Sequence, residues 1–289
     1  TVVGQLGRVM EDLNGRSDVN TIVFEGAGKA FVAGADVKFF VDMIREDSLD
    51  KIEEFTKDGH RVLNMIEDSP HTTIALTTGL ALGGGLELAL SCDYRVGTEK
   101  TMLRFPETSI GIYPGLGGTQ RATRVCGIEA ARFAVLAGNF MDAPTARALG
   151  FITHLVDPSE VSDTVSTIAS SGKPDDKYPG RPSDPSHPVS FMSKAFYSDA
   201  NMGAILSGEV PAGFDPEDKN VARQLKSLSR AAPVGVRIAS DLLDKALSTD
   251  LSAGLQLELD ALDEIFATHD AREGLSALVE GRRPEYVGS

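Results

Sequence analysis

The chain has 289 residues, of which 42% are hydrophobic and 24% are charged, as is usual for a globular protein. Its formal net charge of −14 disfavours nucleic acid and anionic membrane surfaces as partners, because both are polyanions. Cys92 and Cys126 form no Cys-x-x-Cys pair and indicate neither a disulfide framework nor a metal site. We expect reduced, buried thiols in a cytoplasmic protein without a transmembrane helix.

The first half of the chain alternates between helical and strand patterns. Apolar residues at helical spacing predict helices over residues 1–14 and 48–68. Runs rich in β-branched residues predict strands at 21–25, 72–78 and 94–96. This alternation favours an α/β fold whose strands are joined by crossover connections.

The second half is predominantly helical. We expect helices at 128–137, 143–149 and 159–170, with Asp142 as the N-cap of the second, and a strand at 151–156. Residues 171–190 contain five prolines and predict a loop or linker. From about residue 216 the helical pattern returns and continues to about residue 280.

Two carboxylates and two glycine loops carry the chemistry of the sequence. Glu87 follows the triple glycine 83–85 at the start of an apolar helix, and Glu107 lies twenty positions further on. Each feature alone has a structural explanation: a tight turn, a charge at a helix N-terminus, a surface loop residue. A second glycine loop at residues 33–36 weakens those explanations. Two such loops can each offer one N–H to a single carbonyl oxygen, which predicts an oxyanion-stabilising, acid–base site.

Other chemistries have weak support. Residues 26–29 resemble a phosphate loop, but Val23 and Ala30 break the P-loop pattern, and Phe31 stands where the dinucleotide pattern needs a third glycine. The five histidines show no ligand spacing, and we interpret them as structural or exposed. No serine lies in a G-x-S-x-G elbow, so a covalent hydrolase is disfavoured.

Several blocks in a fixed order resemble the enoyl-CoA hydratase/isomerase (crotonase) superfamily, and they cover most of the chain. They are residues 26–36, 79–90, 92–93, 105–111, 114–121, 143–156 and 270–284. The resemblance implies an α/β fold, a crotonase-like spiral of ββα turns with a C-terminal helical region. It divides the chain into a spiral core at 1–170, an insertion or linker at 171–219 and a helical trimerisation region at 220–289.

The resemblance also implies roles for individual residues. The backbone N–H groups of Ala35 and Gly84 would form the oxyanion hole for a CoA thioester carbonyl. Glu87 and Glu107 match the two catalytic glutamates of hydratases, whereas isomerase branches commonly keep only the second. Further residues are implied to contact the substrate or its CoA part: Ala33, Asp36 and Lys38. No metal and no separate cofactor is implied, since coenzyme A is part of the substrate.

The expected reaction is hydration of 2-enoyl-CoA to 3-hydroxyacyl-CoA, with short chains such as crotonyl-CoA plausible. One alternative is double-bond isomerisation or other enolate chemistry on CoA thioesters. Another, from a different class, is a non-catalytic binding or assembly module, such as an RNA-binding homologue. The negative charge argues against RNA, and the presence of both glutamates argues against a module without activity.

Three expectations concern assembly, the start of the chain and the insertion. An apolar stripe in the C-terminal helices, larger than a compact core obviously needs, predicts a homotrimer or hexamer. Its members are Leu251, Leu255, Leu259, Leu262 and Phe266. We also expect the natural polypeptide to extend upstream of Thr1. The insertion and the C-terminal block are similar to archaeal fusion proteins in which a 3-hydroxyacyl-CoA dehydrogenase part precedes the hydratase. The insertion itself is expected to be a partly ordered flap or subunit contact.

Overall fold

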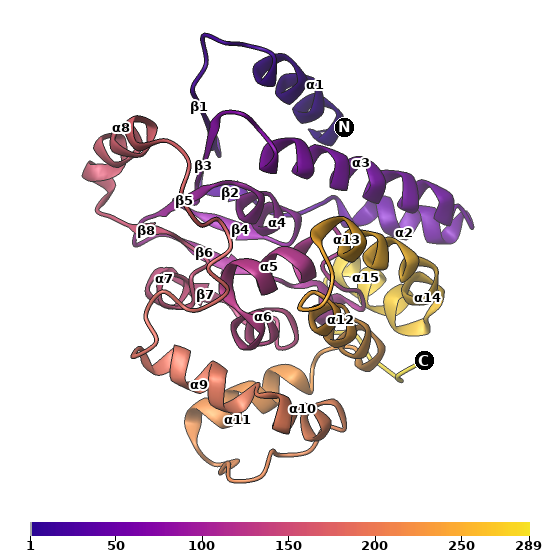
Figure 1. Cartoon of the computed structure of the whole chain (residues 1–289). Helices are drawn as coiled ribbons and strands as arrows, with labels where there is room; N and C mark the ends of the chain where they lie inside the picture. The colour runs from indigo at the N-terminus through magenta and orange to yellow at the C-terminus, as the bar shows by residue number, and fades with distance from the viewer. Residues whose placement is uncertain (1) are drawn as a thin grey trace.

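The computed structural model describes residues 2–289, and its centre holds two four-stranded sheets (Figure 1). The first sheet has the order β1-β3-β5-β8, and all its pairs are parallel. Its strands are β1 (Thr21–Glu25), β3 (Thr72–Leu76), β5 (Tyr94–Gly97) and β8 (His154–Leu155). The three strands predicted in the first half of the chain are therefore confirmed, although the predicted strand 72–78 ends two residues early.

The second sheet has the order β2-β4-β6-β7, with the last pair antiparallel. Its strands are β2 (Ala30–Val32), β4 (Leu80–Leu82), β6 (Met102–Arg104) and β7 (Met141–Asp142). From β1 to β6, successive strands enter the two sheets alternately, and a helical segment follows each pair, which is the expected spiral of ββα turns. The sequence patterns did not predict these strands separately, because two or three residues are too short to show an alternating period.

The α-helices formed by residues 2–126 pack around the sheets. They are α1 (Val2–Asn14), α2 (Val37–Arg45), α3 (Leu49–Glu67), α4 (Gly84–Ser91) and α5 (Gly118–Cys126). The predictions for α1, α3 and the helix that carries Glu87 are confirmed. The patterns gave no prediction for α2 or α5. Among the described residues no helix is long and apolar enough to cross a membrane.

Three further helices follow the spiral as predicted. They are α6 (Ile128–Val135), α7 (Ala143–Leu149) and α8 (Val161–Ser171). The side chain of Asp142 accepts a hydrogen bond of 3.0 Å from Thr145 N, which confirms it as the N-cap of α7. The predicted strand at 151–156 shortens to the two residues of β8.

The insertion packs against the core through two helices, and the expectation that it is a partly ordered flap or a subunit contact stays a prediction. It contains α9 (Pro188–Phe196) and α10 (Asp199–Leu206), which lie at the end of the molecule opposite α1 (Figure 1). Helix α9 packs against α6 and α7. Phe196 and Tyr197 are fully buried, and the Tyr197 carbonyl accepts a hydrogen bond of 2.9 Å from Arg132 Nη1. These aromatic side chains anchor the segment.

The C-terminal part is helical, as predicted, and lies beside the sheets (Figure 1). After α11 (Lys219–Leu228) it consists of α12 (Pro233–Lys245), α13 (Leu251–Asp260), α14 (Leu262–Ala267) and α15 (His269–Glu280).

The apolar stripe of this region is mostly used within the chain. Leu255, Leu262 and Phe266 are buried in the monomer, and Phe40 of α2 stacks on Phe266 with 5.9 Å between ring centroids. The prediction that this stripe exceeds the needs of the chain's own core was therefore wrong.

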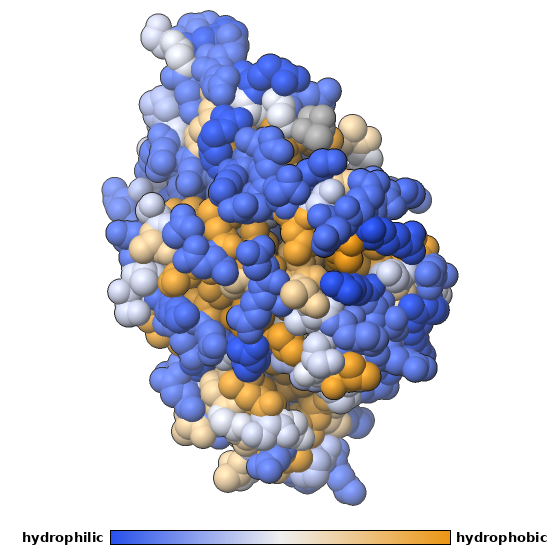
Figure 2. All heavy atoms as spheres, turned by 90° about the vertical axis from the view of Figure 1, so that its right-hand side faces the viewer, coloured by the Kyte–Doolittle hydropathy of each residue, from blue (hydrophilic) through white to orange (hydrophobic). Residues whose placement is uncertain are grey.

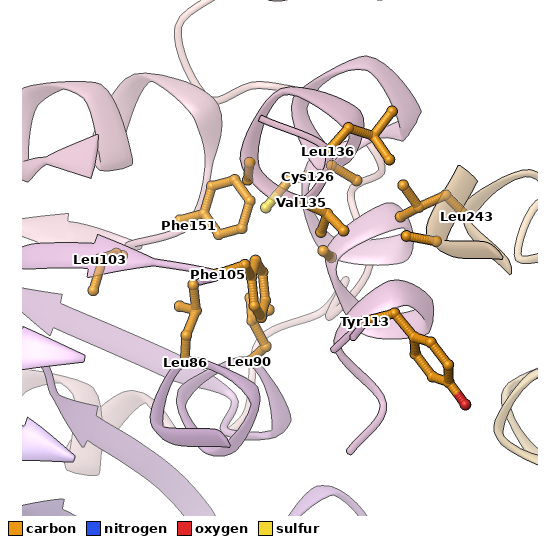
Figure 3. Close-up of a cluster of buried hydrophobic side chains, with 14 of the residues drawn as sticks. Leu86, Leu90, Leu103, Phe105, Tyr113, Cys126, Val135, Leu136, Phe151 and Leu243 are labelled. Atoms are coloured by element: carbon orange, nitrogen blue, oxygen red, sulfur yellow. The ribbon is translucent and has the colours of Figure 1, made fainter. Parts of the chain in front are cut away.

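The main core lies between α4, α5, α6 and the second sheet (Figure 3). Leu86 and Leu90 of α4 face Phe105, whose ring contacts Phe151 edge-on with 6.5 Å between centroids. Cys92 and Cys126 are buried free thiols, as expected. The core therefore fixes α4 firmly against the strand that leads to Glu107.

Candidate active site

Three strands of the second sheet end at the same edge, and the predicted site residues follow them. Parallel pairing places Val32 beside Ala81 and Leu82 beside Arg104. The carboxyl ends of β2, β4 and β6 therefore lie side by side, as at the ligand-binding edge of other parallel sheets. The segments that leave this edge are 33–36, 83–87 and 105–107. Sheet topology thus brings together residues that are up to 74 positions apart, from 33 to 107.

A glycine with positive φ precedes each predicted oxyanion donor. Gly34 has φ 96° before Ala35, and Gly83 has φ 47° before Gly84. A Cβ on Gly83 would lie 2.3 Å from Glu107 Oε1, so both conformation and space require glycine there. The Gly84 N–H belongs to the first turn of α4, where N–H groups have no acceptor within the helix. The Ala35 N–H has no acceptor within residues 2–289.

These groups line a cavity of about 380 Å³. Ala33, Ala35, Gly84, Glu87 and Glu107 all contribute to its wall. The rest of the wall is largely apolar and comes from α2, α3, the 112–116 segment, α14 and α15. Its larger apolar members are Phe40, Phe55, Ile112, Leu116, Leu262, Ile265, Phe266, Leu275 and Leu278. An apolar cavity with a few convergent polar groups is the usual form of a small-molecule site.

Glu87 is held at one oxygen only. Its side chain is 1% exposed, and Oε1 accepts hydrogen bonds from Leu116 N (2.7 Å) and Gly118 N (2.8 Å). A Cβ on Gly118 would lie 2.7 Å from this oxygen, so the backbone can approach because residue 118 is glycine. Oε2 is the oxygen nearer to Gly84, 3.9 Å from the point where a Cβ on that glycine would stand. Oε1 is thus anchored while Oε2 lies on the Gly84 side.

Glu107 has fewer partners. It begins a 3₁₀ turn, Glu107–Ile110, directly after β6 and Pro106, and it is 8% exposed. Its Oε2 is buried and has no hydrogen-bond partner in the described part of the chain. Burying a carboxyl oxygen without a hydrogen bond costs folding free energy. Such a group therefore favours its neutral form, or it obtains a hydrogen bond from a bound ligand.

Burial raises the pKa of both carboxyls. Burial is the largest cause for Glu87, the charges of Glu107 and Glu258 add to it, and the N–H groups of Leu116 and Gly118 oppose it. The pKa of Glu107 rises to about 8, again mainly through burial, and the nearby charge of Arg104 opposes that rise. Because both pKa values are raised, the pair of carboxyls favours retention of a proton toward neutral pH.

A third buried carboxylate, Glu258 of α13, was not among the predicted site residues. It is fully buried and accepts a hydrogen bond of 2.7 Å from Gly117 N, between the two amides that Glu87 binds. The sequence did contain a signal. Glu258 lies three residues after Leu255 and four before Leu262, on the apolar face of its helix, where a lone carboxylate needs partners.

Asp36 and Lys38 lie apart from the cavity wall. The Asp36 side chain accepts a hydrogen bond of 3.0 Å from Lys38 N and so caps α2. The Lys38 ammonium pairs with Asp42 on the exposed side of that helix. Of the three residues expected to contact substrate, Ala33 is the one in the wall of the cavity.

The histidines fit the structural interpretation. His60 and His71 are buried, and each Nε2 lies 2.8 Å from a backbone carbonyl, of Gly115 and Leu13 respectively. Within residues 2–289 no three side chains among His, Cys, Asp and Glu are grouped so as to hold a metal ion.

Curated relatives are similar to this chain over nearly its whole length. The chain is 28% identical to the putative enoyl-CoA hydratase/isomerase YngF of Bacillus subtilis over 98% of this chain and 86% of that protein. It is 26% identical to a short-chain-enoyl-CoA hydratase of Clostridium acetobutylicum, with coverages of 97% and 85%. It is 28% identical to a crotonyl-CoA hydratase of Syntrophomonas wolfei, with coverages of 93% and 81%.

Solved structures show the same fold. An enoyl-CoA hydratase from Rhodobacter sphaeroides superposes with a TM-score of 0.81 at 22% identity, over 99% of this chain and 85% of that one. The sequence model of the enoyl-CoA hydratase/isomerase family matches residues 1–287. With this match over almost every residue, and with the spiral of ββα turns in place, the chain belongs to the enoyl-CoA hydratase/isomerase family.

Proposed function

We propose that this chain adds water across the double bond of a 2-enoyl-CoA thioester to give 3-hydroxyacyl-CoA. One observation carries the proposal: two buried carboxyls, Glu87 and Glu107, share a cavity with the backbone N–H groups of Ala35 and Gly84. Hydration needs a base for water, an acid for carbon and donors for the thioester oxygen, and the cavity offers all of them. Relatives named as short-chain-enoyl-CoA and crotonyl-CoA hydratases support the same reaction.

The reaction would proceed through an enolate. Water attacks C3 of the substrate and gives its proton to a carboxylate. The C2–C3 π electrons move toward the carbonyl, whose oxygen takes negative charge between the N–H groups of Ala35 and Gly84. Loss of one such donor costs roughly 2.7–4 kcal/mol of transition-state stabilisation in a comparable hole. The enolate then collapses as C2 takes a proton from the second carboxyl, so one water has been added in total.

Hydrogen bonding assigns the two roles. Glu87 accepts two backbone N–H groups, which favour its charged form and make it the base toward water. Glu107 has an unpaired buried oxygen, which favours its neutral form and makes it the acid toward C2. A glutamate pair with one proton can thus perform both transfers.

The apolar wall favours a short acyl chain. Ile265 and Phe266 of α14 and Leu275 and Leu278 of α15 contribute to the same cavity as the carboxyls. A cavity of about 380 Å³ must hold the thioester, the acyl chain and a water. We infer that chains of crotonyl size fit best, and rates across a series of chain lengths test this directly.

The central experiment replaces each glutamate by glutamine and follows loss of the enoyl thioester absorbance. Glu87→Gln and Glu107→Gln should each lower kcat by about 10²–10⁴-fold, the usual contribution of a general acid or base. Because both carboxyls serve the same addition of one water, the double variant should be little slower than the slower single variant. Glu99→Gln, at an exposed loop position, is the matched control. Turnover near wild type in either single variant would reject the proposal.

The isomerase alternative is tested in the same assay. Isomerisation of a 3-enoyl-CoA to the 2-enoyl-CoA moves a proton from C2 to C4 and needs no water, so one carboxyl is sufficient. The presence of two buried carboxyls in one cavity favours hydration. A 3-enoyl-CoA converted faster than crotonyl-CoA is hydrated, with Glu87→Gln retaining that rate, would reverse the assignment.

We also propose that the chain associates with copies of itself, as a trimer or a pair of trimers. Leu247, Leu278 and Val279 expose 63%, 51% and 51% of their surface in the C-terminal part. Apolar side chains gather across the middle of one face, with polar ones around them (Figure 2). Light scattering at several concentrations tests the assembly, and a monomer mass at all of them would exclude it.

Four sequence-based expectations remain proposals. We retain the division of the chain into a spiral core, an insertion and a helical region, with boundaries at residues 170 and 219, and we retain a cytoplasmic location. We also retain the proposal of a 3-hydroxyacyl-CoA dehydrogenase part upstream, which the reading frame before Thr1 tests. Asp36 and Lys38 are proposed to bind the CoA part of the substrate. Lys38→Ala should then raise KM with kcat unchanged, and an unchanged KM would remove Lys38 from the site.

A further inference from the structure

The segment 115–119, here called the clamp loop, is held by a buried carboxylate on each side. On one side Glu87 Oε1 accepts the N–H groups of Leu116 and Gly118. On the other side Glu258 Oε2 accepts the intervening N–H of Gly117 at 2.7 Å. Successive amides of the clamp loop therefore point alternately to the two carboxylates, and the left-handed φ of 95° at Gly117 permits this alternation.

Glu258 makes further contacts that fix its own position. Its Oε1 accepts the hydroxyl of Thr119 at 2.5 Å. His60 Nε2 lies 3.2 Å from its Oε2 and 2.8 Å from the carbonyl of Gly115. Both of these atoms are acceptors, so His60 Nε2 must carry the proton and donate. Glu258 and His60 thus hold both ends of the clamp loop.

A second carbonyl of the clamp loop, that of Leu116, is held as well. Arg121 Nη1 donates to the Leu116 carbonyl at 3.2 Å, while its Nε and Nη2 bind Glu67 (2.7 Å) and Asn64 (2.6 Å). Arg121 is fully buried, and a Cβ on Gly117 would lie 1.9 Å from its Nη1. A loop with this many fixed backbone groups has little freedom to move the carboxyl that it binds.

We propose that Glu258 is a positioning residue for Glu87, acting through the clamp loop. Its contacts hold the amides of Leu116 and Gly118 in the orientation that fixes Glu87 Oε1. Oε2 of Glu87 then remains free to meet water. The effect on rate rests on the proposed hydratase function, whereas the effect on the loop does not.

The arrangement joins the C-terminal helices to the catalytic centre. Glu258 lies on α13, 171 residues after Glu87, and the Tyr113 hydroxyl donates to its backbone carbonyl. Figure 3 shows the Tyr113 ring pointing away from the core cluster, with its hydroxyl outermost. Charged and titratable groups around the clamp loop are Glu87 and Glu107 on the cavity side, Glu258 and His60 behind it, and Arg121 beside it.

The first test measures the loop without any substrate. Glu258→Met keeps the length of the side chain and removes its acceptors, and Glu258→Gln restores an acceptor. Hydrogen-exchange mass spectrometry of a peptide covering 113–121 should show faster exchange in the methionine variant. The glutamine variant should restore most of the protection. Glu264→Met, at an exposed position on α14, should leave this peptide unchanged. Unchanged exchange in Glu258→Met would overturn the proposal even if the enzyme proves not to be a hydratase.

The second test measures hydration. Displacing Glu87 by a fraction of an ångström should lower kcat by about 10–100-fold in Glu258→Met, with little change in KM. Because Glu258 acts through Glu87, the methionine substitution should have no further effect in the Glu87→Gln background. Equal losses in both backgrounds, or a kcat that glutamine does not rescue, would overturn the proposal. If Glu258→Met does not fold, Thr119→Val removes one donor from the clamp and must show the same dependence on Glu87. An inactive wild-type protein would reject the hydratase function and leave the exchange test decisive for the clamp.

Discussion

Gly83→Ala is the most informative single substitution, because it adds one methyl group between the proposed oxyanion loop and Glu107, the proposed acid. Gly83 has φ 47° and ψ −120°, a conformation that residues with a side chain rarely adopt. The new Cβ would stand 2.3 Å from Glu107 Oε1, far inside an ordinary contact distance. The substitution therefore perturbs both the backbone and the position of Glu107.

The two effects have different sizes. The strained backbone should cost roughly 1–3 kcal/mol of folding free energy, which a domain with about 5–15 kcal/mol of stability survives. Relief of the clash moves the Glu107 carboxyl from 2.3 Å to a contact beyond 3.4 Å, a displacement of about 1 Å. Misplacement of that size in a catalytic group should lower kcat by about 100-fold.

Gly208→Ala separates the two effects. Gly208 also has positive φ, 73°, but a Cβ there would meet nothing within 4 Å. We expect Gly208→Ala to lower Tm while hydration proceeds at the wild-type kcat, and Gly83→Ala to lose both. The assay is loss of enoyl thioester absorbance at saturating substrate, with Tm measured on the same samples. A Gly83→Ala protein that turns over like Gly208→Ala would refute the geometry described for Glu107.

Three further predictions follow from the carboxyls and a helix cap. The pH–rate profile should be bell-shaped, with both limbs above the ordinary glutamate range and the upper limb near 8, because burial raises the pKa of Glu87 and Glu107; a profile flat from acidic to neutral pH would contradict this. The raised pKa of Glu107 in the folded state stabilises the fold fully below its unfolded value of 4.5, and this stabilisation is lost as pH rises to about 8. Wild-type Tm should therefore fall more than the Tm of Glu107→Gln across that range, and parallel curves would exclude the raised pKa. Asp142→Ala should cost about 1 kcal/mol in denaturant unfolding with kcat unchanged, because it removes the acceptor for Thr145 N.

The sequence predicted the α/β architecture and its longer elements, but it did not predict the shortest strands. The longer strands and most of the predicted helices showed clear periodicity. No strand was predicted for β2, which lies between the glycine-rich segments 26–29 and 33–36, or for β4, which lies after the predicted strand 72–78. Each of these strands has three residues, which is too short to show an alternating hydrophobic pattern. Their extended form depends on the pairing of β2 with β4 and of β4 with β6. The parallel edge that assembles the site is therefore a tertiary property.

The candidate site was foreseeable where it followed a motif. Glu87 and Glu107 stand beside glycine-rich segments, and the structure places both in one cavity. Glu258 stands in an ordinary helix, and its partners Gly117, Thr119 and His60 come from two distant segments. A single sequence indicates that a carboxylate on an apolar face needs partners, but not which ones, because the partners are chosen by packing.

The three buried carboxyls differ in the number of hydrogen bonds that they accept, and this difference indicates which of them holds a proton. Glu258, which does not line the cavity, accepts hydrogen bonds from Gly117 N, Thr119 Oγ1 and His60 Nε2. Glu87 accepts two, both at one oxygen, and Oε2 of Glu107 accepts none. Because each donor favours the charged form, a proton shared by the catalytic pair rests most easily on Glu107. The fold therefore places the proposed acid where donors are fewest and the proposed base where backbone N–H groups hold it. A water bound between the two carboxyls would meet both groups already oriented.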